Sequence, residues 1–211
     1  ANESPLIANN WIHSGNANYY GYGLYFSAGG FSRIVHNSIV KDVYSTYGYY
    51  GLYVNGGANE IYNNIIFEPA GSQTYYAMYY SGSFSVSGSD HNNVWEAGNF
   101  GYFNGVQNTL SAWQTATGWD TNSTNVDPGY TNYDSLRTCN DTLNNSGMPL
   151  EYITKDIDGD DRDVNSPDVG ADEWIGSTPG SFSAGEDKIV CLGKTVTVGQ
   201  AATGGSFLWS T

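Results

Sequence analysis

The chain has 211 residues, of which 13% are charged and 15% are aromatic, and its formal net charge is −14. Many aromatic residues and few charges exclude an intrinsically disordered chain, which needs the opposite balance. The negative charge makes nucleic acid and anionic membrane surfaces poor partners, and cations or neutral polymers more natural ones. We therefore expect no nucleic-acid partner. No apolar run reaches membrane-spanning length, so we also expect no membrane insertion.

A six-residue pattern returns at a nearly constant spacing in the first half of the chain. Its copies read IANNWI, IVHNSI, IYNNII and, more weakly, SDHNNV, and they start at Ile7, Ile34, Ile61 and Ser89. The asparagines that the copies share are 27, 27 and 28 residues apart, at Asn10, Asn37, Asn64 and Asn92. A fixed period in this range is typical of a solenoid, and strand-like repeats predict a parallel β-helix.

The asparagines of this pattern are expected to have a structural role. Successive coils of a parallel β-helix stack closely, and an amide carries both a donor and an acceptor, so matched asparagines can form a hydrogen-bonded ladder. His36 and His91 occupy the places of Asn9 and Asn63 in the pattern. We therefore expect both histidines to be turn residues rather than catalytic ones.

A third strand is expected in each repeat, after a variable loop rich in Tyr and Gly. The predicted strands are Gly23–Phe26, Gly51–Val54, Ala77–Tyr80 and a degenerate Gly101–Phe103. Strand side chains alternate between two faces. If Leu24, Leu52 and Met78 point inward with the isoleucines of the pattern, then Tyr25, Tyr53 and Tyr79 point outward, and Phe103 continues their row.

Two columns of tyrosine are the candidate binding residues of this chain. They are Tyr22, Tyr25, Tyr50, Tyr53, Tyr76 and Tyr79. An outward stripe of phenol rings suits sugar rings, which offer apolar faces and peripheral hydroxyl groups, and it also suits another protein surface. The alternative is that these tyrosines only cover the sheet through their β-propensity and mutual stacking.

The repeat period is lost from about Asn108. Residues 109–114 are expected to form one short helix, which Asn108 caps and Gly118 ends. A turn-rich stretch, an acidic segment and a Gly/Ser/Pro linker follow, and the alternation in the tail predicts the first strands of a β-sandwich. Cys139 and Cys191 lie in regions of different composition, so we favour unpaired or separately paired thiols over a bond between them.

The acidic segment holds alternating carboxylates at Asp156, Asp158 and Asp160. Hard cations such as calcium prefer several such oxygen atoms at once, so these residues are a candidate calcium site. Gly159 does not stand where the helix–loop–helix calcium motif places its glycine, so that motif is not matched. The alternative is that Arg162 balances these charges internally.

Several of these motifs together resemble a known family. The asparagine-rich repeats, Ser111–Gln114, and the acidic run from Asp156 to Arg162 that leads to Asp168–Glu173 look like the C-terminal half of secreted bacterial right-handed parallel β-helix proteins. The tail, with Ala184–Asp187 and Val190–Gly193, resembles the start of an immunoglobulin-like or PKD-like module. Such modules are common in large surface proteins exported by the type IX secretion route. The resemblance implies an all-β fold with β-helix repeats and a closing segment over residues 1–176, and a truncated β-sandwich over 177–211.

The family includes adhesins, polysaccharide lyases and glycoside hydrolases, and the chain itself offers no sharp catalytic constellation. Lyases on this fold use a Lys or Arg base, and the repeats offer only Arg33 and Lys41. A hydrolase needs two carboxylates at a defined separation, and we expect the carboxylates of the repeats to be scattered. These are Asp42, Glu60, Glu68, Asp90 and Glu96.

Three functions therefore remain as hypotheses. The first is an adhesion or carbohydrate-binding module at the cell surface, with a polysaccharide or surface glycan and further domains of the same polypeptide as partners. The second is the trailing half of a lyase or hydrolase, and the third is a structural spacer.

Overall fold

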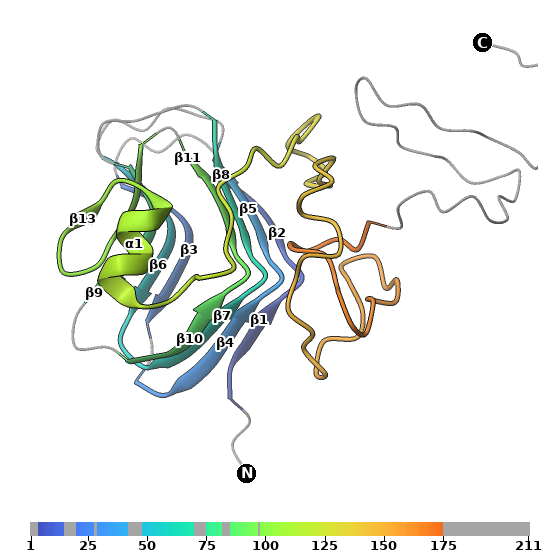
Figure 1. Ribbon diagram of the computed structural model, residues 1–211, viewed down its shortest axis with the longest axis horizontal. Helices are drawn as coiled ribbons and strands as arrows, with labels where there is room; N and C mark the ends of the chain where they lie inside the picture. Colours follow the sequence, from blue (N-terminus) through green and yellow to red (C-terminus); the bar gives the residue numbers. More distant parts are fainter. Residues whose placement is uncertain are drawn as a thin grey trace, which may run out of the picture. The chain divides into compact units, whose positions relative to one another are not determined.

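The computed structural model describes residues 4–14, 20–27, 29–41, 48–69, 75–81, 85–96 and 98–174. Within these ranges the chain is all-β apart from one short helix, and its strands form parallel sheets (Figure 1). The β-sandwich predicted over residues 177–211 lies outside the described residues. The short helix is α1 (Leu110–Thr117). The described residues contain no helix that is long and apolar enough to cross a membrane.

Three sheets are built from strands that the chain adds in turn. The first sheet contains β1 (Leu6–Ala8), β4 (Phe31–Val35), β7 (Ala58–Tyr62) and β10 (Ser85–Asp90). The second contains β2 (Trp11–Ser14), β5 (Ser38–Lys41), β8 (Ile65–Glu68) and β11 (Asn93–Glu96). The third contains β3 (Gly21–Ser27), β6 (Tyr49–Asn55), β9 (Tyr75–Ser81), β12 (Asn99–Tyr102) and β13 (Val106–Gln107).

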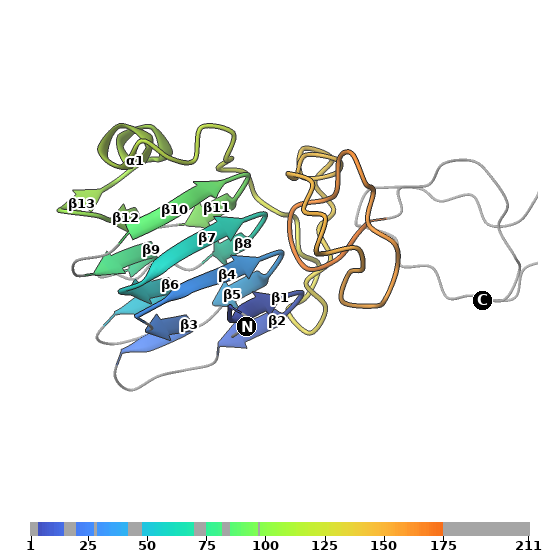
Figure 2. The same cartoon turned by 90° about the horizontal axis from the view of Figure 1, so that it is seen from below.

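Each strand from β1 to β9 pairs in parallel with the strand three places later, so equivalent strands of successive repeats lie side by side (Figure 2). Among the pairings between these strands, the exception is β13, which pairs antiparallel with β12. Ile7, Ile34 and Ile61 stand in one register, as the six-residue pattern predicts. Periodicity in the sequence therefore becomes alignment across the sheets.

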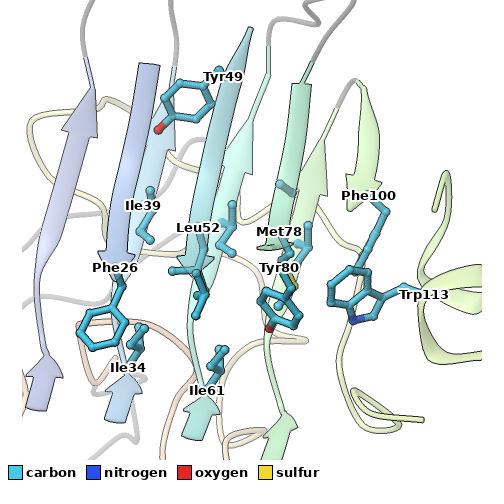
Figure 3. Packing of buried hydrophobic residues seen from close by; sticks show 14 residues of the cluster. Phe26, Ile34, Ile39, Tyr49, Leu52, Ile61, Met78, Tyr80, Phe100 and Trp113 are labelled. Carbon is cyan, nitrogen blue, oxygen red and sulfur yellow. The ribbon is translucent and has the colours of Figure 1, made fainter. Parts of the chain in front are cut away.

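The aligned aliphatic residues form the core between the three sheets. Figure 3 shows side chains from different strands packed against one another, and Ile34, Ile39, Leu52, Ile61 and Met78 are at most 1% exposed. The prediction that these positions point inward is confirmed. Burial of each such side chain contributes about 1.5–3 kcal/mol to folding.

Helix α1 covers one end of this core with a single aromatic ring. Trp113 is fully buried against Phe100 and Tyr80 (Figure 3). Gly101 leaves the space for this ring, because an added Cβ would lie 2.6 Å from the Trp113 ring. The helix is capped by Thr109, whose side chain accepts a hydrogen bond from the amide of Ala112, so the predicted cap at Asn108 is wrong by one residue. The predicted end at Gly118 is confirmed, with φ of 77°.

The asparagine ladder forms as predicted. The Nδ2 atom of Asn10 donates to Oδ1 of Asn37 at 2.8 Å, and the steps from Asn37 to Asn64 and from Asn64 to Asn92 each measure 3.0 Å. The ladder continues for one step that the pattern did not reveal, because Asn92 donates to Asp120 at 3.0 Å. Asp120 stands 28 residues after Asn92, so the spacing itself carried this signal.

A second column precedes the ladder by one residue and turns the chain between the first two sheets. Its members have left-handed backbone, with φ of 51–60°, and are Asn9, His36, Asn63 and His91. The two histidines are therefore turn residues, as predicted. His36 is fully buried, with Nδ1 donating to the Gly170 carbonyl and Nε2 accepting from Asn63. Burial, followed by the charge of Arg162, lowers the pKa of His36 to about 3, so the ring stays neutral.

Residues 126–174, which we call the closing segment, pack against the outer side of the second sheet. Leu136, Leu143 and Val169 of this segment join Val40 and Phe67 in a second buried cluster. The column of left-handed turn residues also binds the closing segment, since Asn63 exchanges hydrogen bonds with the backbone of Met148. Strands β5 and β8 are consequently buried along their whole length.

Cys139 lies in the closing segment and takes part in a disulfide bond. The expectation of an unpaired thiol is therefore wrong for Cys139. Cys191 is the other cysteine of the sequence and lies outside the described residues.

Candidate binding surface and carboxylate clusters

The tyrosine surface is the outer face of the third sheet, and it consists of Tyr22, Tyr25, Tyr50, Tyr53, Tyr76, Tyr79 and Tyr102. Its sequence motif places two tyrosines three residues apart on one face, as at Tyr22 and Tyr25, which are 39% and 51% exposed. The two residues between them both face the interior. An added Cβ on Gly23 would lie 2.3 Å from the Ile39 side chain, and Leu24 packs against the core. The glycine therefore lets both tyrosines reach the outside.

The rings form two columns that run across the strands. In the first column, Tyr50 stacks on Tyr22 and Tyr76 with centroid distances of 5.2 and 6.1 Å. In the second column, Tyr53 stacks on Tyr25 and Tyr79 at 4.9 and 4.8 Å, with interplanar angles of 14° and 7°.

The two columns also meet each other edge to face. Tyr50 and Tyr53 lie 5.3 Å apart at 88°, and Tyr76 and Tyr79 lie 5.5 Å apart at 69°. Stacked and edge-to-face contacts of this kind are worth about 0.5–1.5 kcal/mol per pair beyond area burial. The mutual contacts therefore hold the rings in fixed positions, which fits both a binding role and the covering role that the sequence left open.

The second column continues with Tyr102, and the predicted continuation by Phe103 is wrong. Tyr102 is in register with Tyr79 and stacks on it at 4.7 Å. Phe103 instead packs against the core and contacts the Trp119 ring. The prediction aligned Gly101 with Gly51, but Gly101 pairs with Met78, which itself pairs with Leu52, so the next residue, Tyr102, takes the place in the column.

Burial makes three phenol groups of this surface weaker acids. Burial, followed by neighbouring tyrosines, raises the pKa of Tyr50 to about 12 and raises the pKa of Tyr22 and of Tyr79. A protonated phenol can both donate and accept. The five strands of the third sheet contain no Asp, Glu, Lys or Arg. The surface is thus aromatic, hydroxyl-bearing and uncharged on a chain whose net charge is −14.

The predicted calcium residues are only partly brought together. One oxygen atom each of Asp156, Asp158 and Asp172 lie within 4.8 Å of one another, and this group does not include Asp160. The backbone amide of Asp160 instead donates to Asp156 at 2.8 Å. Asp172 comes from a turn 16 residues further along the chain than Asp156, so no local spacing could have revealed it.

Arginine side chains already balance part of this acidic charge. Arg137 contacts both Asp158 and Asp172, and burial raises the pKa of Asp172 to about 6 although this guanidinium opposes the shift. Arg162 pairs with Glu173 at 3.0 Å rather than with the predicted calcium residues. Three carboxylates suit a hard cation such as calcium, but a cation would compete with Arg137. Calcium binding remains a prediction.

A second polar cluster lies inside the repeats, where we expected scattered charges. Lys41 Nζ lies 3.3 Å from Glu68 Oε1, and both side chains are at most 1% exposed. Glu96 is in register with Glu68, so the expectation of scattered positions is wrong for this pair. Lys41, Glu68 and Glu96 each stand four residues after a ladder asparagine, and this spacing could have revealed the alignment.

Burial makes both glutamates of this cluster weaker acids. Burial raises the pKa of Glu68 to about 7 despite Lys41, and it raises the pKa of Glu96 to about 7 despite a hydrogen bond from Asn125. Among the described residues, Glu68 Oε2 has no hydrogen-bond partner. Since Glu68 is fully buried, it cannot reach a substrate as an acid or a nucleophile.

The other carboxylates of the repeats are also engaged. Glu60 pairs with Arg33 at 2.8 Å, and Asp90 accepts hydrogen bonds from Asn122. Asp42 lies outside the described residues. Comparisons with protein-family models, with curated proteins and with solved structures gave no match for this chain.

Proposed function

We propose that this chain is part of a right-handed parallel β-helix in a large secreted or cell-surface bacterial protein. Strands that join three sheets in turn, with each strand parallel to the one three places later, support the coil. The resemblance of the tail to an immunoglobulin-like or PKD-like module supports type IX export and further domains of the same polypeptide as partners.

The proposed activity is adhesion or carbohydrate binding through the tyrosine surface. The observation that carries it is the ordered double column of rings, in which Tyr25 and Tyr22 remain 51% and 39% exposed. Phenol rings offer an apolar body and a polar tip, which match the C–H faces and hydroxyl groups of sugars. A rigid aromatic surface also loses little conformational entropy on binding. The ligand class is therefore a polysaccharide or a surface glycan.

A lyase or hydrolase is the weaker alternative for the described residues. Lys41 is buried and paired with Glu68, and Arg33 is paired with Glu60, so neither cation of the repeats is available as a base. A purely structural spacer is the other alternative, because stacked tyrosines also stabilise the sheet that they cover.

The experiment compares glycan-array binding of the wild-type chain with that of Tyr53→Ala and Tyr152→Ala. Tyr53 lies in the middle of the tyrosine surface, whereas Tyr152 is 40% exposed and packs on Arg33. Loss of binding in Tyr53→Ala alone is expected. Equal binding by all three proteins would eliminate the tyrosine surface as the binding site, and release of unsaturated products from an acidic polysaccharide would favour the lyase.

A further inference from the structure

We infer that the ligand of the tyrosine surface is an uncharged polymer of hydroxyl-bearing rings, bound lengthwise along the two tyrosine columns. This inference rests on the proposed function and narrows its ligand class. It follows from three properties of the described residues, namely the pairing of every cation, the neutrality of the third sheet and the regular repetition of the rings.

The first property concerns the cations of the chain. Every Lys and Arg among the described residues forms an ion pair with a carboxylate, and these residues are Arg33, Lys41, Arg137, Lys155 and Arg162. A polymer of uronic acids or sulfated sugars needs cationic partners for its charges, and guanidinium groups are the usual ones. To bind such a polymer, a cation of the described part would have to be shared with, or taken from, its carboxylate partner.

The second property is the neutrality of the tyrosine surface itself. Its strands contain no charged residue, and the chain as a whole has 21 acidic residues against 7 basic ones. The summed field therefore repels polyanions during their approach, and the described strands of this sheet carry no cation that would compensate for that repulsion. Burial raises the pKa of Tyr50 to about 12, and a phenol hydroxyl can donate a hydrogen bond to a sugar hydroxyl.

The third property is the repetition of equivalent rings. In the column of Tyr25, Tyr53, Tyr79 and Tyr102 the centroid distances are 4.9, 4.8 and 4.7 Å. A repeating ligand that lies along this column meets the same chemical group on every strand, so each additional unit adds contacts without a new loss of translational freedom. A single sugar can use only a small part of such a surface. Affinity is therefore expected to grow with chain length.

The experiment has two stages and uses the whole chain at about 0.15 M salt, where long-range charge effects are screened beyond about 8 Å. In the first stage, retention is measured on insoluble cellulose, chitin and xylan as uncharged probes, and on polygalacturonate and alginate beads as acidic probes. In the second stage, calorimetry compares the oligosaccharides of the best uncharged probe from dimer to hexamer. Tyr53→Ala and Tyr25→Ala report on the surface, and Tyr152→Ala is the matched control.

We expect retention on at least one uncharged probe and an affinity for the hexamer roughly tenfold or more above that for the dimer. Loss of about tenfold in affinity is expected for Tyr53→Ala and Tyr25→Ala, but not for Tyr152→Ala. Since Tyr25 is 51% exposed, its substitution tests the surface even if Tyr53→Ala does not fold.

Different results would contradict the inference and the proposed function. Retention on acidic probes alone, with the same sensitivity to Tyr25→Ala, would overturn the uncharged ligand and leave the binding surface in place. Equal affinity for dimer and hexamer would overturn the lengthwise mode. Binding that neither tyrosine substitution changes, or retention on none of the probes, would count against both.

Discussion

Replacing Asn64 by alanine is expected to destabilise the protein strongly, because this residue lies in the middle of the asparagine ladder. Its Nδ2 atom donates to Asn92 Oδ1 and to two backbone carbonyls, and its Oδ1 accepts from both the backbone and the side chain of Asn37. The alanine variant leaves the buried amide N–H of Asn37 without its side-chain acceptor. One such orphaned buried group costs about 1–3 kcal/mol, and the other lost bonds add roughly 1 kcal/mol.

The expected decrease in the free energy of unfolding is therefore about 3 kcal/mol. For a chain of this length it corresponds to a fall in melting temperature of roughly 6–12 °C. The assay is denaturant and thermal unfolding followed by circular dichroism and tryptophan fluorescence. Asn10→Ala is the matched control, because Asn10 stands at the exposed end of the same ladder and water can replace its bonds. Equal losses in the two variants would refute the argument that the buried ladder, rather than the turn itself, stabilises the fold.

Three further outcomes are expected. Gly23→Ala lowers the melting temperature, because its Cβ would lie 2.3 Å from Ile39 Cγ2 and 2.6 Å from the Gly51 carbonyl oxygen, whereas Gly29→Ala meets no atom within 4 Å and is the control. Unfolding scans that show equal effects would contradict this. Glu96→Gln is expected to raise the melting temperature at pH 8 and to leave it nearly unchanged at pH 5, because the folded-state pKa of about 7 lies above the ordinary value of 4.5. The folded state therefore holds this proton more tightly, and wild-type stability decreases as pH rises from about 4.5 through 7. His36 acts in the opposite direction below pH 6.5 but equally in both proteins, so a pH-independent difference would disprove the role of Glu96. Calcium at about 1 mM is expected to raise the melting temperature of the wild type and of Asp160→Asn but not of Asp158→Asn. An equal response in all three would exclude the cluster of Asp156, Asp158 and Asp172.

The periodic part of the structure could be predicted from the sequence because alignment across strands follows directly from a fixed repeat length. The inward positions of Leu52 and Met78 and the ladder from Asn10 to Asn92 are confirmed for this reason. The error at Phe103 arose because Gly101 was aligned with Gly51, whereas it pairs with Met78 and so places Tyr102 in the column. Predictions from the repeat are correct only where equivalent residues of successive strands are aligned correctly.

The contacts of the closing segment could not be predicted, because they join residues that no period relates. Arg137 meets Asp158 and Asp172, which are 21 and 35 residues away. Arg162 reaches Asn9, 153 residues earlier in the chain. The sequence showed that charges were present in this segment but not which of them would meet. The group of carboxylates that lie close together therefore includes Asp172, which the sequence did not reveal, and not Asp160.

The amide row that ends at Asp120 has a direction. Asn37, Asn64 and Asn92 each accept a hydrogen bond through the amide oxygen and donate one through the amide nitrogen to the next member. A carboxylate cannot donate, and Asp120 collects hydrogen bonds from Asn92, Ser123 and the Trp113 indole. The row therefore ends at Asp120, and a further amide could join it only at Asn10. Growth of this amide row past Asp120 would need an N–H group that the carboxylate lacks, so one acidic side chain serves as its terminus.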